Sequence, residues 1–232
     1  MSKVKEEKDL VAPGDVVYEG DEIYPNSGVY QEDGKIISKY TGLVQYGKTS
    51  VRVVPMSGRY IPGEGDIVIG EVSSVGYSNW RVDLNSPYEG MLKIDTAVDE
   101  YIDLDEDDLT DYYDVGDAIV VEVSKVTEGY DVNLSMEDRR CRKLRGGRII
   151  QVYPSKVPRV IGKKGTMVKQ IKSKTDCKII VGQNGLVWIS GDKANLAARA
   201  IKKVEKEAHT SGLTDRIGEW LDEQLENNEV NE

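Results

Sequence analysis

A short glycine-containing loop, VIGKKG at residues 160–165, holds the residues of this chain best suited to binding phosphate. Two lysines, Lys163 and Lys164, lie between Gly162 and Gly165. Two glycines let a backbone turn tightly and approach a sugar-phosphate strand without side-chain collision, and a following helix offers the N–H groups of its first turn to phosphate. The lysines add positive charge. The loop therefore predicts contact with the phosphates of a nucleic acid rather than an ordinary basic turn.

Sequence patterns for nucleotide chemistry do not fit this loop. A Walker-type loop, G-x-x-x-x-G-K-[ST], needs a glycine where Val160 stands and a lysine where Thr166 stands. A dinucleotide fingerprint needs a third glycine and a parallel βαβ unit. His209 is the only histidine, and neither Cys141 nor Cys177 has a base nearby in the sequence. These patterns indicate a binding protein with no catalytic residues and no cofactor.

Charge is distributed unevenly along the 232 residues, whose net charge is −10. Residues 139–178 hold fourteen basic side chains against one acidic one, Asp176, whereas residues 95–117 hold eleven acidic side chains and no Lys or Arg. A dense local basic patch is the electrostatic footprint of nucleic-acid binding even in an acidic protein. The linker cations from Arg139 to Arg148 could contact RNA or only keep a domain junction soluble, and the sequence leaves both readings open.

The cysteines and the hydropathy of the chain indicate the cellular compartment in which the protein is expected. The two cysteines are far apart and form no C-x-x-C pair, which argues against a disulfide framework or a cysteine-based zinc site. No apolar run approaches the ~20 residues of a membrane span, and MSKVKEEKDL at the N-terminus lacks the apolar core of a signal peptide. The expectation is a soluble, cytoplasmic protein with no membrane contact.

The loop must be positioned by an α/β domain, because the hydrophobic pattern changes from short strands to helical periodicity near residue 148. We expect the order strand, helix, helix, strand, strand, helix, with TMVKQIKSKT as the helix after the loop and CKIIVG and LVWIS as strands joined by a QNG turn. In the last helix, Leu196, Ala197, Ala200, Ile201, Val204 and Ala208 share one stripe, with Asp192 as the expected N-cap.

Two β modules are expected before this domain. Short runs rich in Val, Ile and Tyr between residues 11 and 60 are separated by Gly, Pro, Asn and Asp, which is typical of small antiparallel sheets. From Pro62 to Met136 about five strands and a long acidic excursion suit a closed barrel of OB type, in which Trp80 alternates with Val82 and Leu84 toward the core. The dipeptide GD precedes an apolar run at Asp15, Asp66 and Asp117, which indicates recurrent chemistry at strand entry.

The predicted organisation is therefore multidomain, β plus α/β. Its parts are a flexible arm at 1–10, an N-terminal β domain at 11–61, an OB-type barrel at 62–137, a basic linker at 138–147, an α/β domain at 148–210, and an amphipathic helix with an acidic tail at 211–232. The terminal segment has Leu213, Ile217, Trp220, Leu221 and Leu225 at helical spacing. Packing of this helix on its own chain is favoured over docking on a partner.

This order of modules resembles a known family. The phrases GRYIPGEGDIVIG at 58–70 and VGQNGLVW at 181–188, together with the VIGKKG loop, are similar to the cap subunit of the archaeal exosome that carries S-one and KH domains, the ribosomal-RNA-processing-protein-four type. The resemblance covers residues 11 to 208. It implies an S-one barrel of OB type, a type-one KH domain, and a G-x-x-G clamp on single-stranded RNA.

The resemblance also implies partners and a role. Three such subunits, in a homotrimeric or mixed cap, would bind a hexameric ring of RNase PH-like proteins through the N-terminal module and parts of the barrel. The cap would recruit RNA 3′ ends, with some preference for poly(A), and deliver them to the ring for 3′-to-5′ degradation. The RNA-binding residues would be Gly162, Lys163, Lys164 and Gly165 with Arg159 and Lys169 beside them.

The barrel departs from its family in one respect. S-one barrels use aromatic residues to stack bases, whereas Ser78 and Arg81 occupy the matching positions here. A charge-based contact through Arg81 or Lys93 is therefore expected in place of stacking.

Two other functions compete with the cap role. A free-standing regulator of translation or ribosome biogenesis would use the same barrel and KH modules but would ignore RNase PH-like rings. A metal-dependent nuclease would use the acidic run at 95–117, although this run lacks the glycine and terminal glutamate of an EF-hand loop. A solvated or ring-facing loop is the favoured interpretation of that run, with no bound metal, and it could also repel RNA from the outer side of the barrel.

Overall fold

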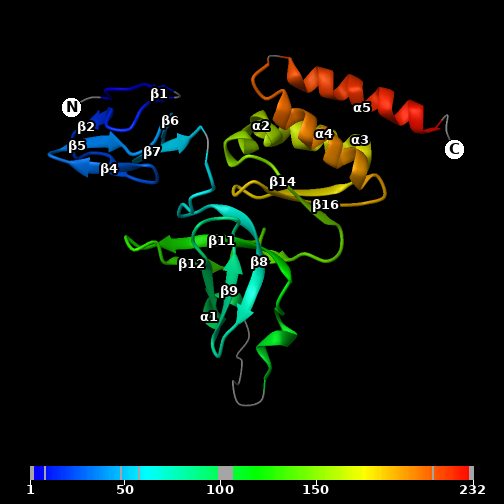
Figure 1. Ribbon diagram of the computed structural model, residues 1–232, viewed down its shortest axis with the longest axis horizontal. Coiled ribbons are helices and arrows are strands. Elements are labelled where there is room, and N and C mark those ends of the chain that lie inside the picture. The colour runs from blue at the N-terminus through cyan, green and yellow to red at the C-terminus, as the bar shows by residue number, and fades with distance from the viewer. Residues whose placement is uncertain are drawn as a thin grey trace.

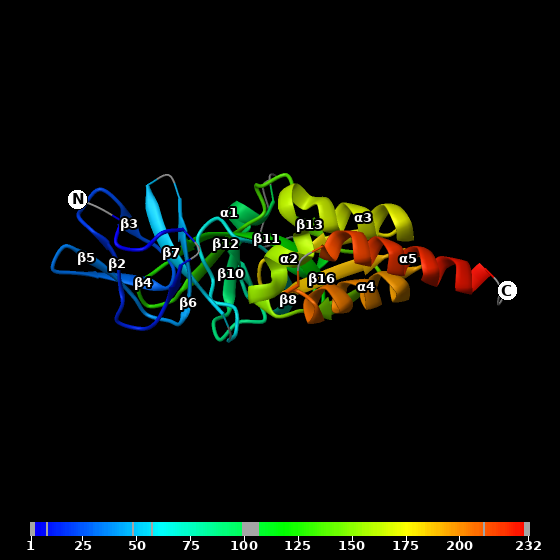
Figure 2. The same ribbon diagram turned by 90° about the horizontal axis from the view of Figure 1, so that it is seen from above.

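The structure is a computed structural model that describes residues 3–7, 9–47, 49–56, 58–98, 107–210 and 212–229. Three units are visible in Figure 1: an N-terminal β domain in blue, a barrel in cyan and green, and a helix-covered sheet from green to red. The N-terminal domain and the helix-covered sheet lie toward opposite ends of the long axis, with the barrel below and between them in Figure 1, and helix α5 extends to the C-terminal end in Figure 2. This confirms the multidomain β plus α/β fold expected from the sequence.

The N-terminal domain consists of two small sheets around a valine-rich core. One sheet has the order β1-β6-β7-β3 and the other the order β2-β5-β4. Their bounds are β1 Leu10–Val11, β2 Val16–Glu19, β3 Tyr24–Pro25, β4 Val29–Glu32, β5 Lys35–Ser38, β6 Gly42–Tyr46 and β7 Ser50–Pro55. Val17, Ile36, Val44 and Val51 are fully buried between them. Residues 4 and 5, in the segment expected as a flexible arm, donate their N–H groups to the Val17 carbonyl at 3.1 and 3.2 Å.

The barrel is closed by five strands. Its sheet has the order β12-β10-β9-β8-β11, and β12 also pairs with β11, which completes the circle. The strands are β8 Ile67–Val75, β9 Asn79–Asp83, β10 Gly90–Lys93, β11 Ala118–Val126 and β12 Val132–Ser135, with the short helices α1 Ile94–Ala97 and η1 Leu109–Asp111 between β10 and β11. Trp80 is 0% exposed, and its indole N–H donates to the Tyr113 carbonyl at 2.9 Å. Trp80 therefore belongs to the core, as its alternation with Val82 predicts.

The three GD dipeptides form the same turn. The carboxylates of Asp15, Asp66 and Asp117 each accept the backbone N–H of the residue three positions earlier, at 2.9, 3.3 and 2.7 Å. The preceding glycines have φ angles of 90°, 81° and 91°, which a side chain would strain. Each turn delivers the chain into β2, β8 or β11, so the prediction of recurrent strand-entry chemistry is confirmed.

The α/β domain has a three-stranded antiparallel sheet in the order β14-β16-β15 with helices on one face, the arrangement expected of a KH domain. Its elements follow the predicted order: β14 Arg148–Gln151, η2 Pro154–Lys156, α2 Val157–Ile161, η3 Lys163–Gly165, α3 Thr166–Thr175, β15 Lys178–Val181, β16 Leu186–Ser190 and α4 Ala194–Lys206. The expected stripe on α4, including Leu196, Ile201 and Val204, is buried. Asp192 is not the N-cap, because α4 begins one residue later than the pattern predicts and Lys193 occupies that position without a side-chain cap.

The C-terminal helix α5, Leu213–Glu229, packs on α3 and α4 of its own chain. Ile217 and Leu221 are fully buried and Leu213 is 5% exposed. Trp220 and Leu225 pack against the same core. The favoured prediction of intramolecular packing is confirmed.

The KH sheet packs part of its second face against the barrel. Trp188 of β16 forms a cluster with Ile67 and Ile69 of β8 and with Leu144 of the linker. The linker contains a strand that the sequence did not indicate, β13 Arg142–Lys143, which pairs antiparallel with β11. The basic linker is therefore partly a sixth strand of the barrel sheet.

The β15–β16 turn connects the KH domain to the barrel by hydrogen bonds. Asn184 is 0% exposed, donates to the carbonyls of Ile69 and Leu84 at 2.6 and 2.8 Å, and accepts the Ile69 N–H at 3.3 Å. Gln183 binds both the N–H and the carbonyl of Ile67, at 2.7 and 2.9 Å. This turn therefore satisfies backbone groups of β8 that the barrel's own ladder leaves free.

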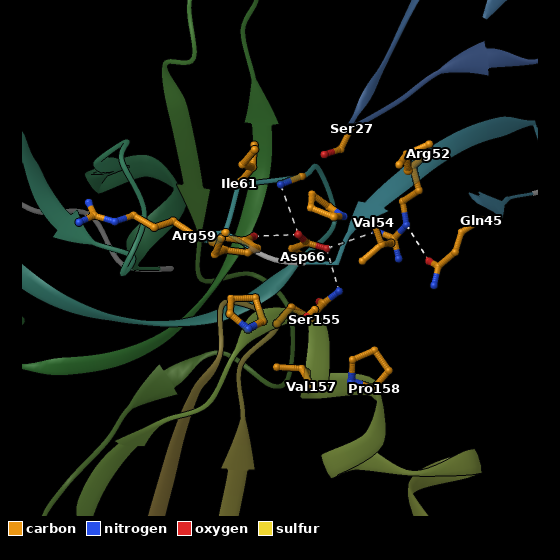
Figure 3. A pocket seen from close by; sticks show the side chains of 17 residues that line it. Ser27, Gln45, Arg52, Val54, Arg59, Ile61, Asp66, Ser155, Val157 and Pro158 are labelled. Carbon is orange, nitrogen blue, oxygen red and sulfur yellow. Dashed lines mark hydrogen bonds and ion pairs between the residues drawn. The ribbon is translucent and has the colours of Figure 1, made fainter. Parts of the chain in front are cut away.

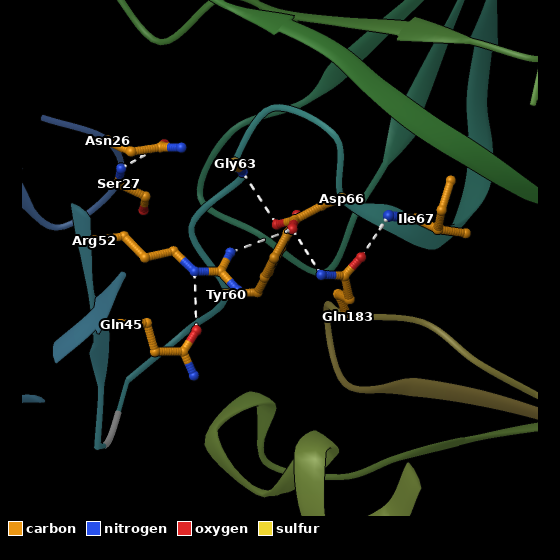
Figure 4. A network of polar contacts seen from close by, with 9 residues as sticks. All are labelled: Asn26, Ser27, Gln45, Arg52, Tyr60, Gly63, Asp66, Ile67 and Gln183. Carbon is orange, nitrogen blue, oxygen red and sulfur yellow. Dashed lines mark hydrogen bonds and ion pairs between the residues drawn. The ribbon is translucent and has the colours of Figure 1, made fainter. Parts of the chain in front are cut away.

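Asp66 extends this contact to the N-terminal domain (Figure 4). Its carboxylate accepts hydrogen bonds from the Tyr60 hydroxyl at 2.7 Å and from Gln183 at 2.8 Å, and Arg52 of β7 lies 3.9 Å away. Burial raises the pKa of Asp66, and the hydrogen bond from Tyr60 and the charge of Arg52 oppose that rise. The pKa of Tyr60 is also raised, by burial and by the charge of Asp66. One carboxylate thus meets side chains from all three domains.

Replacing Asn184 by alanine should destabilise the union of barrel and KH domain, because three buried backbone groups would lose their partner. The free energy of unfolding should fall by about 2–4 kcal/mol. The measurement is urea unfolding followed by tryptophan fluorescence, since Trp188 lies in the same interface. Asn195→Ala, which removes only an exposed bond to Arg148, is the matched control and should change stability by about 0.5 kcal/mol or less. Equal stability of the two variants would contradict this role.

Candidate nucleic-acid interface

The GKKG loop is a tight turn between helices α2 and α3. Gly162, Lys164 and Gly165 have φ angles of 76°, 54° and 78°, all in the region that favours glycine. The Gly162 N–H donates to the Pro158 carbonyl at 3.0 Å, and the Gly165 N–H donates to the Gly162 carbonyl at 3.1 Å. These bonds define the turn, and both lysine side chains are left exposed.

The two glycines serve different purposes. A Cβ at Gly162 would lie 2.7 Å from the Met167 backbone nitrogen, so the start of α3 packs directly on this residue. A Cβ at Gly165 would meet only the Lys169 side chain at 3.7 Å, and only its positive φ favours glycine there. Gly162 is therefore required for packing, and Gly165 for backbone conformation.

Helix α3 begins at the loop without a side-chain cap, because Gly165 occupies its N-cap position. The N–H groups of a first turn have no partner within the helix, and the positive end of the helix dipole favours an anion there. The Thr166 N–H already donates to the Lys163 carbonyl, and phosphate oxygens are suitable acceptors for the N–H groups that follow it in the first turn.

Two further cations flank the loop, and their contact with RNA stays a prediction. Arg159 lies on α2 before the loop and Lys169 lies on α3 one turn after it, and both are exposed. Among the described residues, Arg159, Lys163, Lys164 and Lys169 form none of the ion pairs found elsewhere in the chain. Their charge is available to a ligand.

The predicted RNA-binding residues of the barrel are less available to a ligand than the cations around the loop. Arg81 on β9 and Lys93 on β10 are exposed on neighbouring strands. Arg81 forms an ion pair with Glu89 at 3.4 Å, and Ser73 donates to the same carboxylate. A contact between RNA and Arg81 would have to compete with Glu89, so the charge-based role of these two residues stays a prediction.

A cavity at the junction of the three domains is shown in Figure 3. It is lined by Arg52 and Gln45 from the N-terminal domain, Tyr60 and Asp66 from the start of the barrel, and Pro158 from α2. Its central carboxylate already accepts the bonds described above. The polar centre of the cavity is thus used for domain contacts.

The acidic run at 95–117 lies partly outside the described residues, at 99–106. Of the described part, Leu109 and Tyr113 are buried in the barrel core. Within the part of the chain that the structure describes, no three Asp, Glu, His or Cys side chains come close enough to hold a metal. In the same part, no helix combines the length and apolarity needed to cross a membrane.

Family models match all three domains. The model described as the exosome RNA-binding protein RRP4 N-terminal domain matches residues 8–57, the RRP4 S1 domain matches 59–125, and the KH domain matches 147–206. An S1 barrel joined to a KH domain with an exposed G-x-x-G loop defines an RNA-binding protein.

Similar proteins identify the family. The chain is 46% identical to the exosome complex component Rrp4 of Methanobrevibacter smithii, over 91% of this chain and 70% of that protein. It is 39% identical to the protein of the same name from Methanothermus fervidus, over 95% and 98%. A crystal structure described as an exosome complex RNA-binding protein aligns with 36% identity and a TM-score of 0.67, over 74% of this chain and 99% of that one. The chain belongs to the Rrp4 family of exosome complex components.

The two loop glycines should respond differently to alanine. Gly162→Ala should lower the free energy of unfolding of the KH domain by more than 2 kcal/mol, because it adds a backbone clash to the strain of a positive φ. Gly165→Ala should cost about 1 kcal/mol, for the strain alone. Thermal unfolding of both variants checks this order, and a larger loss for Gly165→Ala would contradict the assigned roles.

Reversing the loop charges should weaken RNA binding without unfolding the domain, because both lysines are exposed. In Lys163→Asp/Lys164→Asp, the slope of log affinity against log salt should flatten by at least about 1.4, at ~0.7 per lost phosphate contact on a single strand. Fluorescence anisotropy with a labelled oligoadenylate measures it. The control is Lys39→Asp/Lys206→Asp, which makes the same charge change at exposed sites away from the loop. Equal slopes in the two double variants would refute the clamp.

Proposed function

We propose that this protein is a non-catalytic cap subunit of an exosome, which holds single-stranded RNA and delivers 3′ ends to a ring of RNase PH-like subunits for 3′-to-5′ degradation. The observation that carries RNA binding is the geometry of the GKKG loop, with its uncapped helix start and four exposed cations. Membership of the Rrp4 family supports assembly with other exosome subunits.

The N-terminal domain offers a surface for the ring. Leu10 of β1 pairs with Leu43 of β6, which in turn pairs with Val54 of β7, so the three side chains form one row across the sheet. Leu10 is 58% and Leu43 38% exposed. Neighbouring apolar side chains on a sheet surface are typical of protein interfaces. We propose that this row, called the leucine row below, docks on the ring.

The proposed function also includes the composition of the cap, its RNA preference and its cellular location. The cap would contain three copies, or a mixture with another cap protein. We also propose that the cap prefers poly(A) and that the protein is located in the cytoplasm. The two free cysteines, Cys141 and Cys177, are compatible with a reducing compartment.

The first experiment is analytical ultracentrifugation of the protein alone and mixed with a reconstituted RNase PH-like hexamer. Co-sedimentation at three copies per ring, followed by faster degradation of a tailed RNA by the assembled complex, is the expected result. Failure to join the ring would overturn the cap role and favour a free-standing RNA-binding regulator. RNA cleavage by the isolated protein in Mg²⁺ would overturn the non-catalytic assignment.

Charging the leucine row should weaken ring binding. Leu10→Lys/Leu43→Lys should raise the dissociation constant for the hexamer at least tenfold, because burying an apolar side chain is worth about 1.5–3 kcal/mol. Ile149→Lys, at a 39% exposed apolar site on strand β14 of the KH domain, is the control and should bind the ring like the unmodified chain. RNA affinity of the free double variant should equal that of the unmodified chain. Unchanged ring affinity in the double variant would place the interface elsewhere.

A further inference from the structure

A basic groove lies between the KH domain and the barrel linker, separate from the GKKG loop. Its rim carries cations from three segments: Arg142, Lys143 and Arg145 from the linker, Lys172 from α3, and Lys178 from β15. Its floor includes the apolar side chains of Leu144, Ile180 and Trp188. No carboxylate lines this groove among the described residues. A cationic rim over an apolar floor suits a ligand with charged phosphates and flat bases.

Most of these cations form no ion pair of their own. Lys143 is the exception, because it forms an ion pair with Asp117 and donates to the Tyr112 carbonyl at 3.3 Å. Arg142, Arg145, Lys172 and Lys178 form no ion pair within the described parts of the chain. Burial lowers the pKa of the Lys172 ammonium, and the nearby Arg142 guanidinium lowers it further. An anion in the groove would relieve this repulsion.

The fold holds these like charges together. Backbone pairing of β13 with β11 fixes Arg142 at the barrel edge, where it lies opposite Val120. The burial of Leu144 and Trp188 in the cluster between the two domains holds the linker against the KH sheet, and the Trp188 indole N–H donates to the Gly146 carbonyl at 2.8 Å. Domain packing therefore compensates the cost of bringing the cations close.

Helix α3 connects the loop to the groove. Lys169 approaches Gly165 at one end, and Lys172, three residues further along the helix, is on the same side and lines the groove. The opposite side of α3 is covered by α5, where Lys174 donates to the Gly218 carbonyl at 3.1 Å. Seven residues of helix separate Gly165 from Lys172, which is about 10 Å at 1.5 Å per residue. A strand leaving the loop along the open side of α3 reaches the groove.

We infer that this groove is a second RNA site, which binds the phosphodiester backbone of the segment that continues from the GKKG loop. It uses Arg142, Arg145, Lys172 and Lys178, so the linker belongs to the RNA-binding surface. The inference rests on the proposed RNA-binding function and extends it, because it assigns a longer footprint than the four nucleotides that a G-x-x-G loop clamps.

The test compares a short and a long RNA on the full chain. The variant Arg142→Gln/Lys172→Gln should lose about tenfold in affinity for a 12-nucleotide oligoadenylate at 0.15 M salt, with a salt slope flatter by about 1.4. Its affinity for a 4-nucleotide oligoadenylate, which the loop alone can hold, should change less than twofold. Lys39→Gln/Lys206→Gln, with the same loss of charge away from the groove, should bind both RNAs as the unmodified chain does. Circular dichroism and thermal unfolding verify the fold of each variant.

Several outcomes would overturn the groove site. Equal binding of the long RNA by the groove and control variants would do so, while leaving the loop clamp and the proposed function in place. An equal loss for both RNA lengths would show a general electrostatic effect. Loss of ring association with unchanged RNA affinity would assign the groove to an acidic protein surface. If the unmodified chain binds neither RNA, the proposed RNA-binding function itself fails and the groove site with it.

Discussion

The structure depends on the packing of the buried Asn184 and the half-buried Gln183 against the first half of β8. A barrel strand whose backbone N–H and C=O groups are not all paired within its sheet could pair with another chain. Here two amide side chains and the backbone of a turn form hydrogen bonds with those groups. Asp66 stands at the start of the same strand and binds Gln183, Tyr60 and the N-terminal domain around one carboxylate. The orientation of the KH domain, and so of its RNA loop, follows from these few polar contacts.

Elements with strong local signals could be predicted closely from the sequence. Helix α3 spans the predicted TMVKQIKSKT, and β16 matches the predicted run LVWIS residue for residue. In each case the periodicity and the adjacent glycine, proline or polar turn lie within a few residues of the element. The GKKG loop belongs to the same group, because its glycines, its lysines and the helix after it are contiguous.

Features created by tertiary contacts could not be predicted in this way. Strand β13 has two residues, and it exists because β11 offers a free edge beside the linker. The QNG turn has the same composition whether it faces water or a barrel strand, so the burial of Asn184 left no local signal. The cations of the basic groove lie up to 36 positions apart, 142 to 178, and counting charges along the sequence does not show that they meet in space. The prediction of Asp192 as the N-cap of α4 is wrong, because this residue of favourable type lies one position before the actual N-cap, Lys193.

The packing of Trp188, Leu144 and Asn184 between barrel and KH domain has a consequence for affinity. Two weak sites on independently moving domains would lose chain entropy each time one RNA joined them. The separation of the proposed loop and groove sites is set during folding, so a strand held at the first would meet the second at a high effective concentration. Modest individual contacts can then hold a long strand firmly, while each contact alone still exchanges fast enough to let that strand advance.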